Sequence, residues 1–274
     1  MLQDLADRVA VVTGAAGGIG AALCRRLAAE GMRVVAADID GDGARATARA
    51  TDGLAVRVDV SDPDSVAALA DRAFEAFGQV DLLCNNAGVF QGGRTWELAA
   101  ADWDWTLGVN VMGIVHGISA FVPRMIDQGT DGHVVNTASV AAIVSAPLSA
   151  PYIVSKAAAF TLTECLAHDL RSVGSRIGAS VLVPSAVDTG IARTAAVRPE
   201  RFGVDRSETG PAVGAILADM VASGLQPDDV VDPVLDAVRN DTFVIPTRPS
   251  YDDQVAGRFH ALAARDLPAD LTID

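Results

Sequence analysis

Short apolar segments alternate with longer segments of helical periodicity along most of this 274-residue chain. Strand-like apolar runs lie at 8–13, 32–37, 54–58, 80–84, 133–137, 177–183 and 243–246. Between them, apolar residues at helical spacing predict helices at 19–31, 42–50, 63–77, 103–128, 152–172, 212–223 and 228–239. Strands that are apolar throughout and separated by helices form parallel sheets covered on both faces. Because crossovers are right-handed, the pattern predicts an α/β fold with a doubly wound parallel sheet and helices on both faces.

Length and composition predict one α/β domain over residues 1–274. The formal net charge of −14 argues against nucleic acid and membranes as partners, because both repel an acidic protein. We expect a cytoplasmic protein, since no signal peptide opens the chain and the cysteines are few and scattered. No metal site is expected, because the four histidines lack metal-ligand spacing; they are His116, His133, His168 and His260.

Two segments depart from the alternating pattern. From Pro184 to about Pro211 it fades into small and charged residues. A loop of this length inside a compact domain is usually functional, so we expect a lid at about 185–211. The last part of the chain, about 240–274, is an atypical tail in which only the run 243–246 predicts an element.

A glycine-rich turn, Thr13–Gly20, joins the first strand to the first helix. Gly14 permits a tight turn, whereas Gly18 and Gly20 permit close approach of a phosphate and close packing of the helix. A phosphate bound there would lie at the helix N-terminus, where backbone N–H groups lack partners. An ordinary tight turn is the alternative, but the position between a strand and a helix favours a dinucleotide site.

Polar residues follow the next strands at the same edge of the predicted sheet. Asp38 ends the second strand, where a carboxylate can accept both ribose hydroxyls of NAD and would repel the 2′-phosphate of NADP. Asp59 follows the third strand and can reach an adenine amino group, although a loop aspartate before a capped helix is an equally good interpretation. The fourth strand ends in Asn85–Gly88, a segment of amide and small residues that lets the backbone pass close to a ligand.

Tyr152 and Lys156 are four residues apart on a predicted helix, so their side chains share one face. An ammonium group there would stabilise the phenolate and lower the pKa of the tyrosine, which could then exchange a proton near neutral pH. Ser139 follows the fifth strand, where its hydroxyl can hold a carbonyl or carbinol oxygen. Asn110 is a poor helix former early in its helix and could hold a water that relays protons to Lys156. Each of these residues also has a purely structural interpretation in packing, a loop or a helix bend.

These motifs together resemble the short-chain dehydrogenase/reductase family, in its single-domain branch. The resemblance covers residues 5 to about 190. The family's T-G-x-x-x-G-x-G motif appears as Thr13–Gly20 and its N-N-A-G motif as Asn85–Gly88. Its catalytic tetrad appears as Asn110, Ser139, Tyr152 and Lys156. The resemblance implies a Rossmann fold and an oxidoreductase activity.

The resemblance also implies a role for each residue of the site. In this family the tyrosine is the general acid/base, the lysine lowers its pKa and holds the nicotinamide ribose, the serine positions the substrate oxygen, and the asparagine supports a proton relay. The implied cofactor is NAD, with Asp38 as the residue that marks this preference. The implied cofactor-binding residues are Gly14, Gly18, Ile19, Gly20, Asp38, Asp59, Val60, Asn86, Ala87, Gly88, Tyr152, Lys156, Pro184, Val187 and Thr189.

The chain departs from the family pattern at two points. The family's Pro-Gly before the nicotinamide segment is Pro184-Ser185 here, which suggests a shifted backbone. The family's C-terminal strand signature is absent, which puts the common tetramer interface in doubt, and we expect a homodimer or a homotetramer. The tail and the segments 121–125 and 198–203 resemble a subgroup that acts on bulky secondary alcohols and includes the Cα-dehydrogenases of aryl ethers.

We therefore expect hydride transfer between NAD and a bulky, mostly apolar secondary alcohol or ketone, rather than a small polyol or a charged acid. The expected pocket walls are Phe90, Val140, Ile143, Val187 and the segment 191–202. That last segment contains three cations that could still bind a carboxylate, Arg193, Arg198 and Arg201. The alternatives are a polyol, a steroid or an acyl thioester as substrate, or a non-catalytic NAD-binding regulator, which would not need an intact tetrad.

Overall fold

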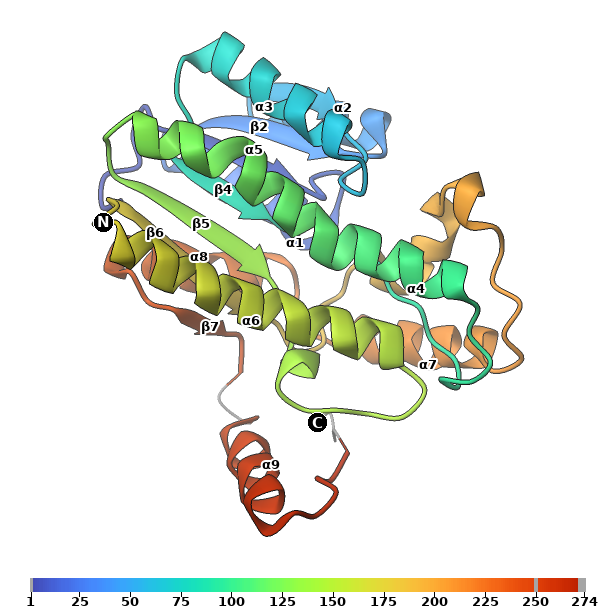
Figure 1. Ribbon diagram of the computed structural model, residues 1–274. Helices are drawn as coiled ribbons and strands as arrows, with labels where there is room; N and C mark the ends of the chain where they lie inside the picture. The colour runs from blue at the N-terminus through green and yellow to red at the C-terminus, as the bar shows by residue number, and fades with distance from the viewer. Residues whose placement is uncertain (1, 249–250, 271–274) are drawn as a thin grey trace.

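The computed structural model describes residues 2–248 and 251–270, which form a seven-stranded sheet between two layers of helices (Figure 1). The strand order is β3-β2-β1-β4-β5-β6-β7, and every described strand pair is parallel. This confirms the predicted doubly wound sheet. The strands are β1 Val9–Thr13, β2 Arg33–Asp38, β3 Leu54–Arg57, β4 Leu82–Asn85, β5 Gly132–Thr137, β6 Ile177–Val183 and β7 Val244–Pro246.

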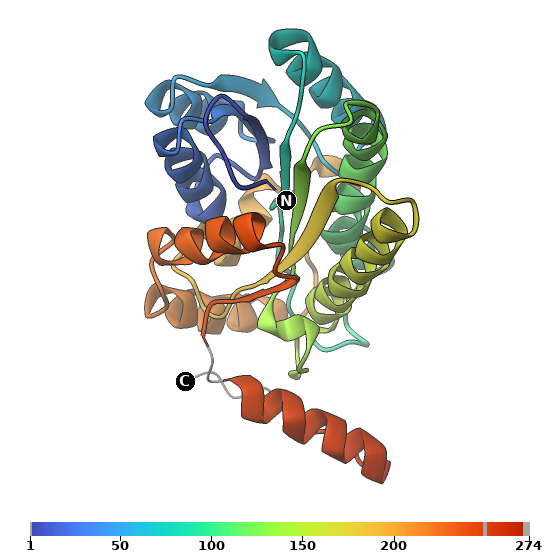
Figure 2. The same cartoon turned by 90° about the vertical axis from the view of Figure 1, so that its left-hand side faces the viewer.

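Helices cover both faces of the sheet, as Figure 2 shows along the strands. One face carries α1 (Gly18–Ala29) and α8 (Asp228–Asn240), whose apolar residues share a buried cluster with Ala10 and Val12. The other face carries α3 (Pro63–Phe77), α5 (Gly113–Asp127) and α6 (Ala150–Ser172). Their buried residues pack against Val9 and Val11. Alternate residues of the central strand therefore anchor opposite layers, as period-two geometry requires.

The remaining helices lie beside α1, around the carboxyl edge of the sheet and in the tail. They are α2 Gly41–Ala50, α4 Ala100–Leu107, α7 Gly210–Ala222 and α9 Asp252–Ala264, with short helical turns η1 Gly108–Met112, η2 Val140–Ala142, η3 Gly190–Val197 and η4 Glu200–Phe202. The predicted helix over 103–128 is in fact divided by η1, a π-helical turn between α4 and α5. Helix α9 was not expected from the sequence. It contains no buried residue, so the burial pattern that marks other helices is missing.

Two apolar stretches are long enough to raise the question of a membrane span. The uncharged stretch between His133 and Ser155 forms strand β5, the turn η2 and the start of α6, as predicted. The helical segment Ala100–Asp127 passes the test of length and hydropathy, but 44% of its most apolar window is buried. Phe121 and Met125, for example, lie in the core beside the sheet. A buried core helix passes the same test.

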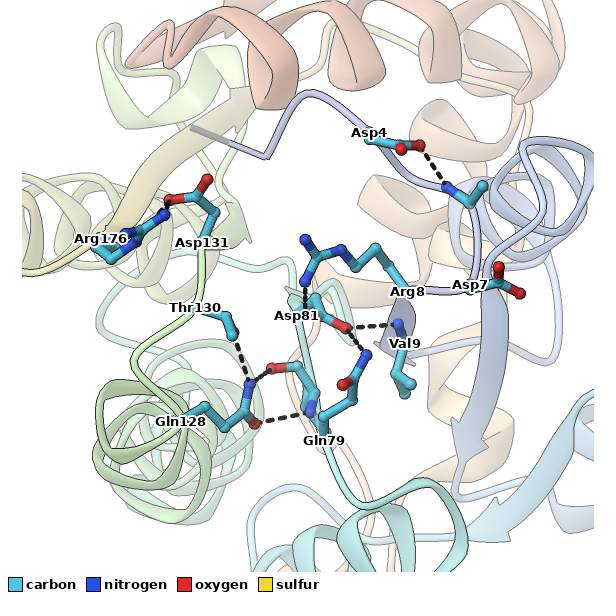
Figure 3. Close-up of polar contacts among 12 residues, drawn as sticks. Asp4, Asp7, Arg8, Val9, Gln79, Asp81, Gln128, Thr130, Asp131 and Arg176 are labelled. Atoms are coloured by element: carbon cyan, nitrogen blue, oxygen red, sulfur yellow. Dashed lines mark hydrogen bonds and ion pairs between the residues drawn. The ribbon is translucent and has the colours of Figure 1, made fainter.

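At the amino edge of the sheet, a buried carboxylate joins β1 to the start of β4 (Figure 3). Oδ2 of Asp81 accepts hydrogen bonds from the Val9 N–H at 2.8 Å and from Nε2 of Gln79 at 2.9 Å. Oδ1 forms an ion pair with Arg8 at 3.0 Å. Asp81 itself is fully buried. This network aligns two strands whose opposite ends carry the glycine turn and the Asn85–Gly88 segment.

Replacing this carboxylate should cost much of the stability of the fold. We expect Asp81→Ala to lower the free energy of unfolding by about 2–4 kcal/mol, because it leaves the buried Val9 N–H without a partner. Arg8→Ala should cost less, about 1 kcal/mol or below, because the arginine is partly exposed. Urea unfolding followed by circular dichroism measures both. Equal losses for the two variants would contradict this account of the network.

Candidate active site

A cavity of about 710 Å³ lies at the carboxyl edge of the sheet, around the switch in strand order between β1 and β4. Most of the predicted site residues line it. They are Gly14, Gly18, Ile19, Asp38, Asp59, Val60, Asn86, Ala87, Gly88, Ser139, Tyr152, Lys156, Pro184, Val187 and Thr189. Two predicted residues, Gly20 and Asn110, stand behind its wall. The structure therefore brings together residues that the sequence spreads over 176 positions, from Gly14 to Thr189.

The glycine turn has the shape needed for an anion site. Gly14 has a φ of 68°, and a Cβ there would lie 2.8 Å from the Cα of Ala87. Gly20 packs against the backbone of Gly14, so its role is helix packing. Gly17 faces open space and caps α1 without a side-chain hydrogen bond. The first N–H groups of α1 thus border the cavity without a side-chain partner, and this geometry suits a phosphate.

Strand ends around the cavity are tied together by hydrogen bonds. Oγ1 of Thr13 accepts from the N–H groups of Asn86 at 3.0 Å and Ala87 at 3.1 Å. Nδ2 of Asn86 donates to the Thr13 carbonyl at 3.1 Å. Nδ2 of Asn85 donates to Oδ1 of Asn136 at 2.9 Å and so joins β4 to β5. The Asn85–Gly88 segment therefore holds the glycine turn and β5 in place while its backbone lines the cavity.

Asp38 lies at the end of the cavity next to the glycine turn. Its Oδ2 accepts from the Ala16 N–H and its Oδ1 from the Asp40 N–H, both at 2.9 Å. Burial raises the pKa of Asp38 despite these hydrogen bonds. Asp40 uses its carboxylate to cap α2. Arg57 is a nearby cation, but its Nε binds the carbonyl of Ile39 at 3.2 Å and it does not line the cavity.

Asp59 binds the lid, a contact that the sequence did not reveal. Its Oδ1 accepts from the N–H and hydroxyl of Ser61 at 3.0 and 2.6 Å. Its Oδ2 forms an ion pair with Arg201 of η4 at 2.7 Å. Burial pushes the pKa of Asp59 upward, but the hydrogen bonds from Ser61 and Arg201 outweigh it, and the net pKa is lowered. The predicted contact of Asp59 with adenine remains a prediction, and a second partner now competes for this carboxylate.

Tyr152 and Lys156 lie on one face of α6, as predicted, but their electrostatics differ from the prediction. Nζ of Lys156 donates to the carbonyl of Thr137 at 3.0 Å and lies 5.6 Å from the centre of the Tyr152 ring. Burial lowers the pKa of Lys156 to about 8. Burial also raises the pKa of Tyr152, and a hydrogen bond with Ser139 lowers it only in part. The net pKa shift is therefore opposite to the predicted lowering, because desolvation outweighs the other effects in the protein without a cofactor. The contribution of Lys156 itself stays a prediction.

Asn110 lies in the π-helical turn η1 and is fully buried. Its Oδ1 accepts from the Val89 N–H at 2.8 Å, and its Nδ2 donates to the Val89 carbonyl at 2.9 Å and to Oγ of Ser155 at 2.8 Å. A Cβ placed on Gly88 would lie 3.5 Å from Oδ1 of Asn110 and 3.3 Å from Nζ of Lys156. The Asn110 amide therefore holds the loop after β4 beside helix α6. Its role in a water relay remains a prediction.

The two departures from the family pattern are in contact. The N–H of Ser185 donates to Oγ1 of Thr247 at 2.9 Å, and the two hydroxyls are 3.1 Å apart. Thr247 follows β7, at the start of the atypical tail. A serine in place of the family glycine therefore gains a partner that this tail provides.

The lid is anchored by a buried arginine. Arg198 forms an ion pair with Asp102 of α4 at 2.7 Å, and both side chains are nearly inaccessible to solvent. Its guanidinium also donates to Oε1 of Gln91 at 3.1 Å and lies 5.0 Å from the centre of the Trp105 ring. The sequence alone could not reveal this pair, because its members lie 96 positions apart on segments without shared periodicity.

Apolar side chains form the rest of the cavity wall. Phe90, Val140 and Val187 line it, as predicted. Ile143 does not line it and packs against the core cluster near η2, because the turn directs its side chain inward. Helix α7 contributes a wall that the sequence analysis missed, formed by Val213, Ile216, Leu217, Met220 and Val221. The high apolar content of α7 is the sequence feature that could have predicted this wall.

Comparisons with known proteins agree with this geometry. The short chain dehydrogenase profile matches residues 8–199. A crystal structure of a short chain dehydrogenase/reductase from Burkholderia phymatum in complex with NAD has a TM-score of 0.95 and is 41% identical, covering 98% of this chain and 99% of that one. A 1-deoxy-11-beta-hydroxypentalenate dehydrogenase from Streptomyces exfoliatus is 40% identical over 81% of this chain and 82% of its own. A C alpha-dehydrogenase from Sphingobium sp. is 30% identical over 95% and 87%.

The chain therefore belongs to the short-chain dehydrogenase/reductase family, and the predicted resemblance is confirmed. It is an oxidoreductase of the dehydrogenase/reductase type with a Rossmann-like fold.

The position of Tyr152 in the cavity predicts a large effect of removing its hydroxyl. Tyr152→Phe should lower kcat by roughly a hundredfold or more, because it deletes the proton donor and little volume. NADH binding, measured by fluorescence, should change little. Lys156→Ala should damage both turnover and cofactor binding. A Phe variant that keeps more than about a tenth of wild-type kcat would exclude the tyrosine as general acid/base.

Proposed function

We propose that this protein is an NAD-dependent dehydrogenase that interconverts a bulky, mostly apolar secondary alcohol and its ketone. The observation that carries the proposal is one cavity with Tyr152, Ser139 and Lys156 on its wall and the glycine turn and Asp38 at its far end. The relative from Burkholderia phymatum, crystallised with NAD, supports the choice of cofactor. The Streptomyces and Sphingobium relatives are both named as dehydrogenases, the former of a hydroxypentalenate.

The groups that line the cavity match the chemical groups of NAD. The open N-terminus of α1 suits the pyrophosphate, and Asp38 suits the hydroxyls of the adenosine ribose. Among the described residues that line this end of the cavity there is no Lys or Arg to bind a 2′-phosphate. Lys156 lines the part of the cavity beside Tyr152, where the nicotinamide half would be held, and Thr189 lines the cavity next to Gly18 of the glycine turn.

Proton transfer follows from the positions of the wall residues. In the oxidation direction, the Tyr152 phenolate takes the proton of the substrate hydroxyl while Ser139 donates a hydrogen bond to the same oxygen. When bound, NAD would supply the acceptor for the hydride of the carbinol carbon. The charge of Lys156 on the same wall favours the phenolate. The proton then leaves Tyr152 toward solvent. In reduction the phenol returns a proton to the carbonyl oxygen.

The walls argue for an apolar substrate. The Phe90 ring lies 5.2 Å from the Tyr152 ring, so an apolar surface begins directly beside the reacting atoms. Helix α7 continues this surface with aliphatic side chains. Such walls favour an aryl or alkyl body and offer few hydrogen bonds to a polyol.

We also propose that the protein acts in the cytoplasm as a homodimer or homotetramer. Helix α9 lies apart from the sheet layers in both ribbon views. Phe259 and Leu262 on this helix are exposed at 61% and 47%. A second copy of the chain that covers these residues would account for an otherwise unfavourable apolar surface.

NAD should be preferred over NADP, because Asp38 would face the additional phosphate without a compensating cation. The double variant Asp38→Ala with Ile39→Arg should shift the ratio of kcat/KM values toward NADP. Initial rates with both cofactors at one fixed alcohol concentration measure the shift. Equal kcat/KM values for the two cofactors in the wild type would refute the role of Asp38.

A panel of alcohols and ketones, followed at 340 nm, tests the proposed substrate class. An aryl or long-alkyl carbinol should exceed a short polyol in kcat/KM by about tenfold or more, since each buried methylene adds specificity. Tyr152→Phe serves as the control for background oxidation. If sorbitol or a short hydroxy acid outperformed every aryl carbinol, the polyol or acid alternative would replace this proposal. If no alcohol or ketone reacted while NAD bound, the protein would be a non-catalytic regulator.

A further inference from the structure

We infer that Arg193 is a specificity-determining residue that binds a carboxylate at the end of the substrate remote from the reacting carbinol. The inference deepens the proposed function and rests on it, because it places the carbinol of the same substrate at Tyr152. It also narrows the substrate class to bulky, apolar secondary alcohols that carry one carboxylate.

The three arginines between residues 191 and 202 have different surroundings. Arg198 is buried in its ion pair with Asp102, and Arg201 is paired with Asp59. Arg193 lines the cavity, and no hydrogen bond or ion pair joins it to any residue in the described part of the chain. Two of the three cations therefore serve to hold the lid. Of these three, only Arg193, an exposed residue, lies at the cavity wall with its donors unpaired.

The backbone next to Arg193 is fixed relative to the catalytic tyrosine. Oγ1 of Thr194 accepts from the Phe90 N–H at 3.0 Å and donates to the Ile191 carbonyl at 3.0 Å. Phe90 in turn packs against the Tyr152 ring. Arg193 thus extends from a turn that is held one apolar side chain away from the reacting centre. A substrate that reached both Tyr152 and Arg193 would need an apolar middle that covers Phe90.

The acidic side chains that line the cavity do not pair with Arg193, so its guanidinium can bind an anionic substrate. Asp38, Asp40 and Asp59 line the cofactor end, and each already accepts hydrogen bonds there. Asp270 of the tail also lines the cavity, but no ion pair joins it to Arg193. Because the whole chain has a net charge of −14, its field repels anions. An anionic substrate would need a local cation, and a guanidinium matches a carboxylate with two parallel hydrogen bonds.

Matched substrates test the inference. The probes are 4-(1-hydroxyethyl)benzoate and its methyl ester, and the longer pair in which a biphenyl replaces the benzene ring. In the wild type, kcat/KM for the carboxylate of at least one pair should exceed that for its ester by roughly tenfold, mainly through a lower KM. Arg193→Gln should abolish this preference while leaving ester turnover nearly unchanged, and Arg193→Lys should restore part of it. High salt should reduce the preference of the wild type.

A matched control is available on the same segment. Arg206 is exposed, does not line the cavity and has no hydrogen bond or ion pair with the described residues. Arg206→Gln removes the same charge and should keep the carboxylate preference. As a readout without turnover, the carbinol carboxylate and its ester can be titrated into the enzyme–NADH complex, in which neither can be oxidised, and Arg193→Gln should weaken only the binding of the carboxylate.

The outcomes separate the inference from the proposed function. If the esters are oxidised as well as the carboxylates in both pairs, or if Arg206→Gln removes the preference as fully as Arg193→Gln, the inference fails and the proposed function stands. If neither carboxylates nor esters react while NADH binds, the proposed function fails and the inference falls with it.

Discussion

The parallel pairing of β1 with β4 is the constraint on which the site depends. At the amino edge, the buried carboxylate of Asp81 ties the N–H of Val9 to the start of β4. At the carboxyl edge, Thr13 binds the backbone of the segment that follows β4. Because the strand order reverses here, the chain leaves the sheet on opposite sides and a crevice opens between the two strand ends. The glycine turn, the Asn85–Gly88 segment and helix α6 all border that crevice.

The side chains of Tyr152 and Lys156, the predicted catalytic groups, are held at an electrostatic cost. Lys156 is buried with a carbonyl as its hydrogen-bond partner, and burial lowers its pKa to about 8. Tyr152 has its pKa raised by the same desolvation. Without a bound cofactor, this raised pKa favours the protonated form of Tyr152. The positive charge of an oxidised nicotinamide would then shift both groups together, which links proton transfer to cofactor binding.

The lid combines a rigid base with adjustable contacts. The buried pair of Arg198 and Asp102 fixes its path against α4, where removal of one partner would leave an uncompensated charge. The pair of Arg201 and Asp59 is partly exposed and therefore weaker and dependent on salt. The two pairs therefore hold residues 198–201 against α4 and against the segment after β3 with different strengths.

The sequence by itself determined the alternation of strands and helices that makes a doubly wound parallel sheet, the glycine turn and the spacing of Tyr152 and Lys156, because these depend on local periodicity and on motifs within one segment. The π-helical turn around Asn110 and the solitary helix α9 were not predicted, since neither shows the apolar spacing of a regular buried helix. The pKa directions, the partners of Arg198 and Arg201 and the apolar wall from α7 were decided only by the tertiary structure. Desolvation and long-range pairing depend on which segments meet, and no window of sequence contains that information.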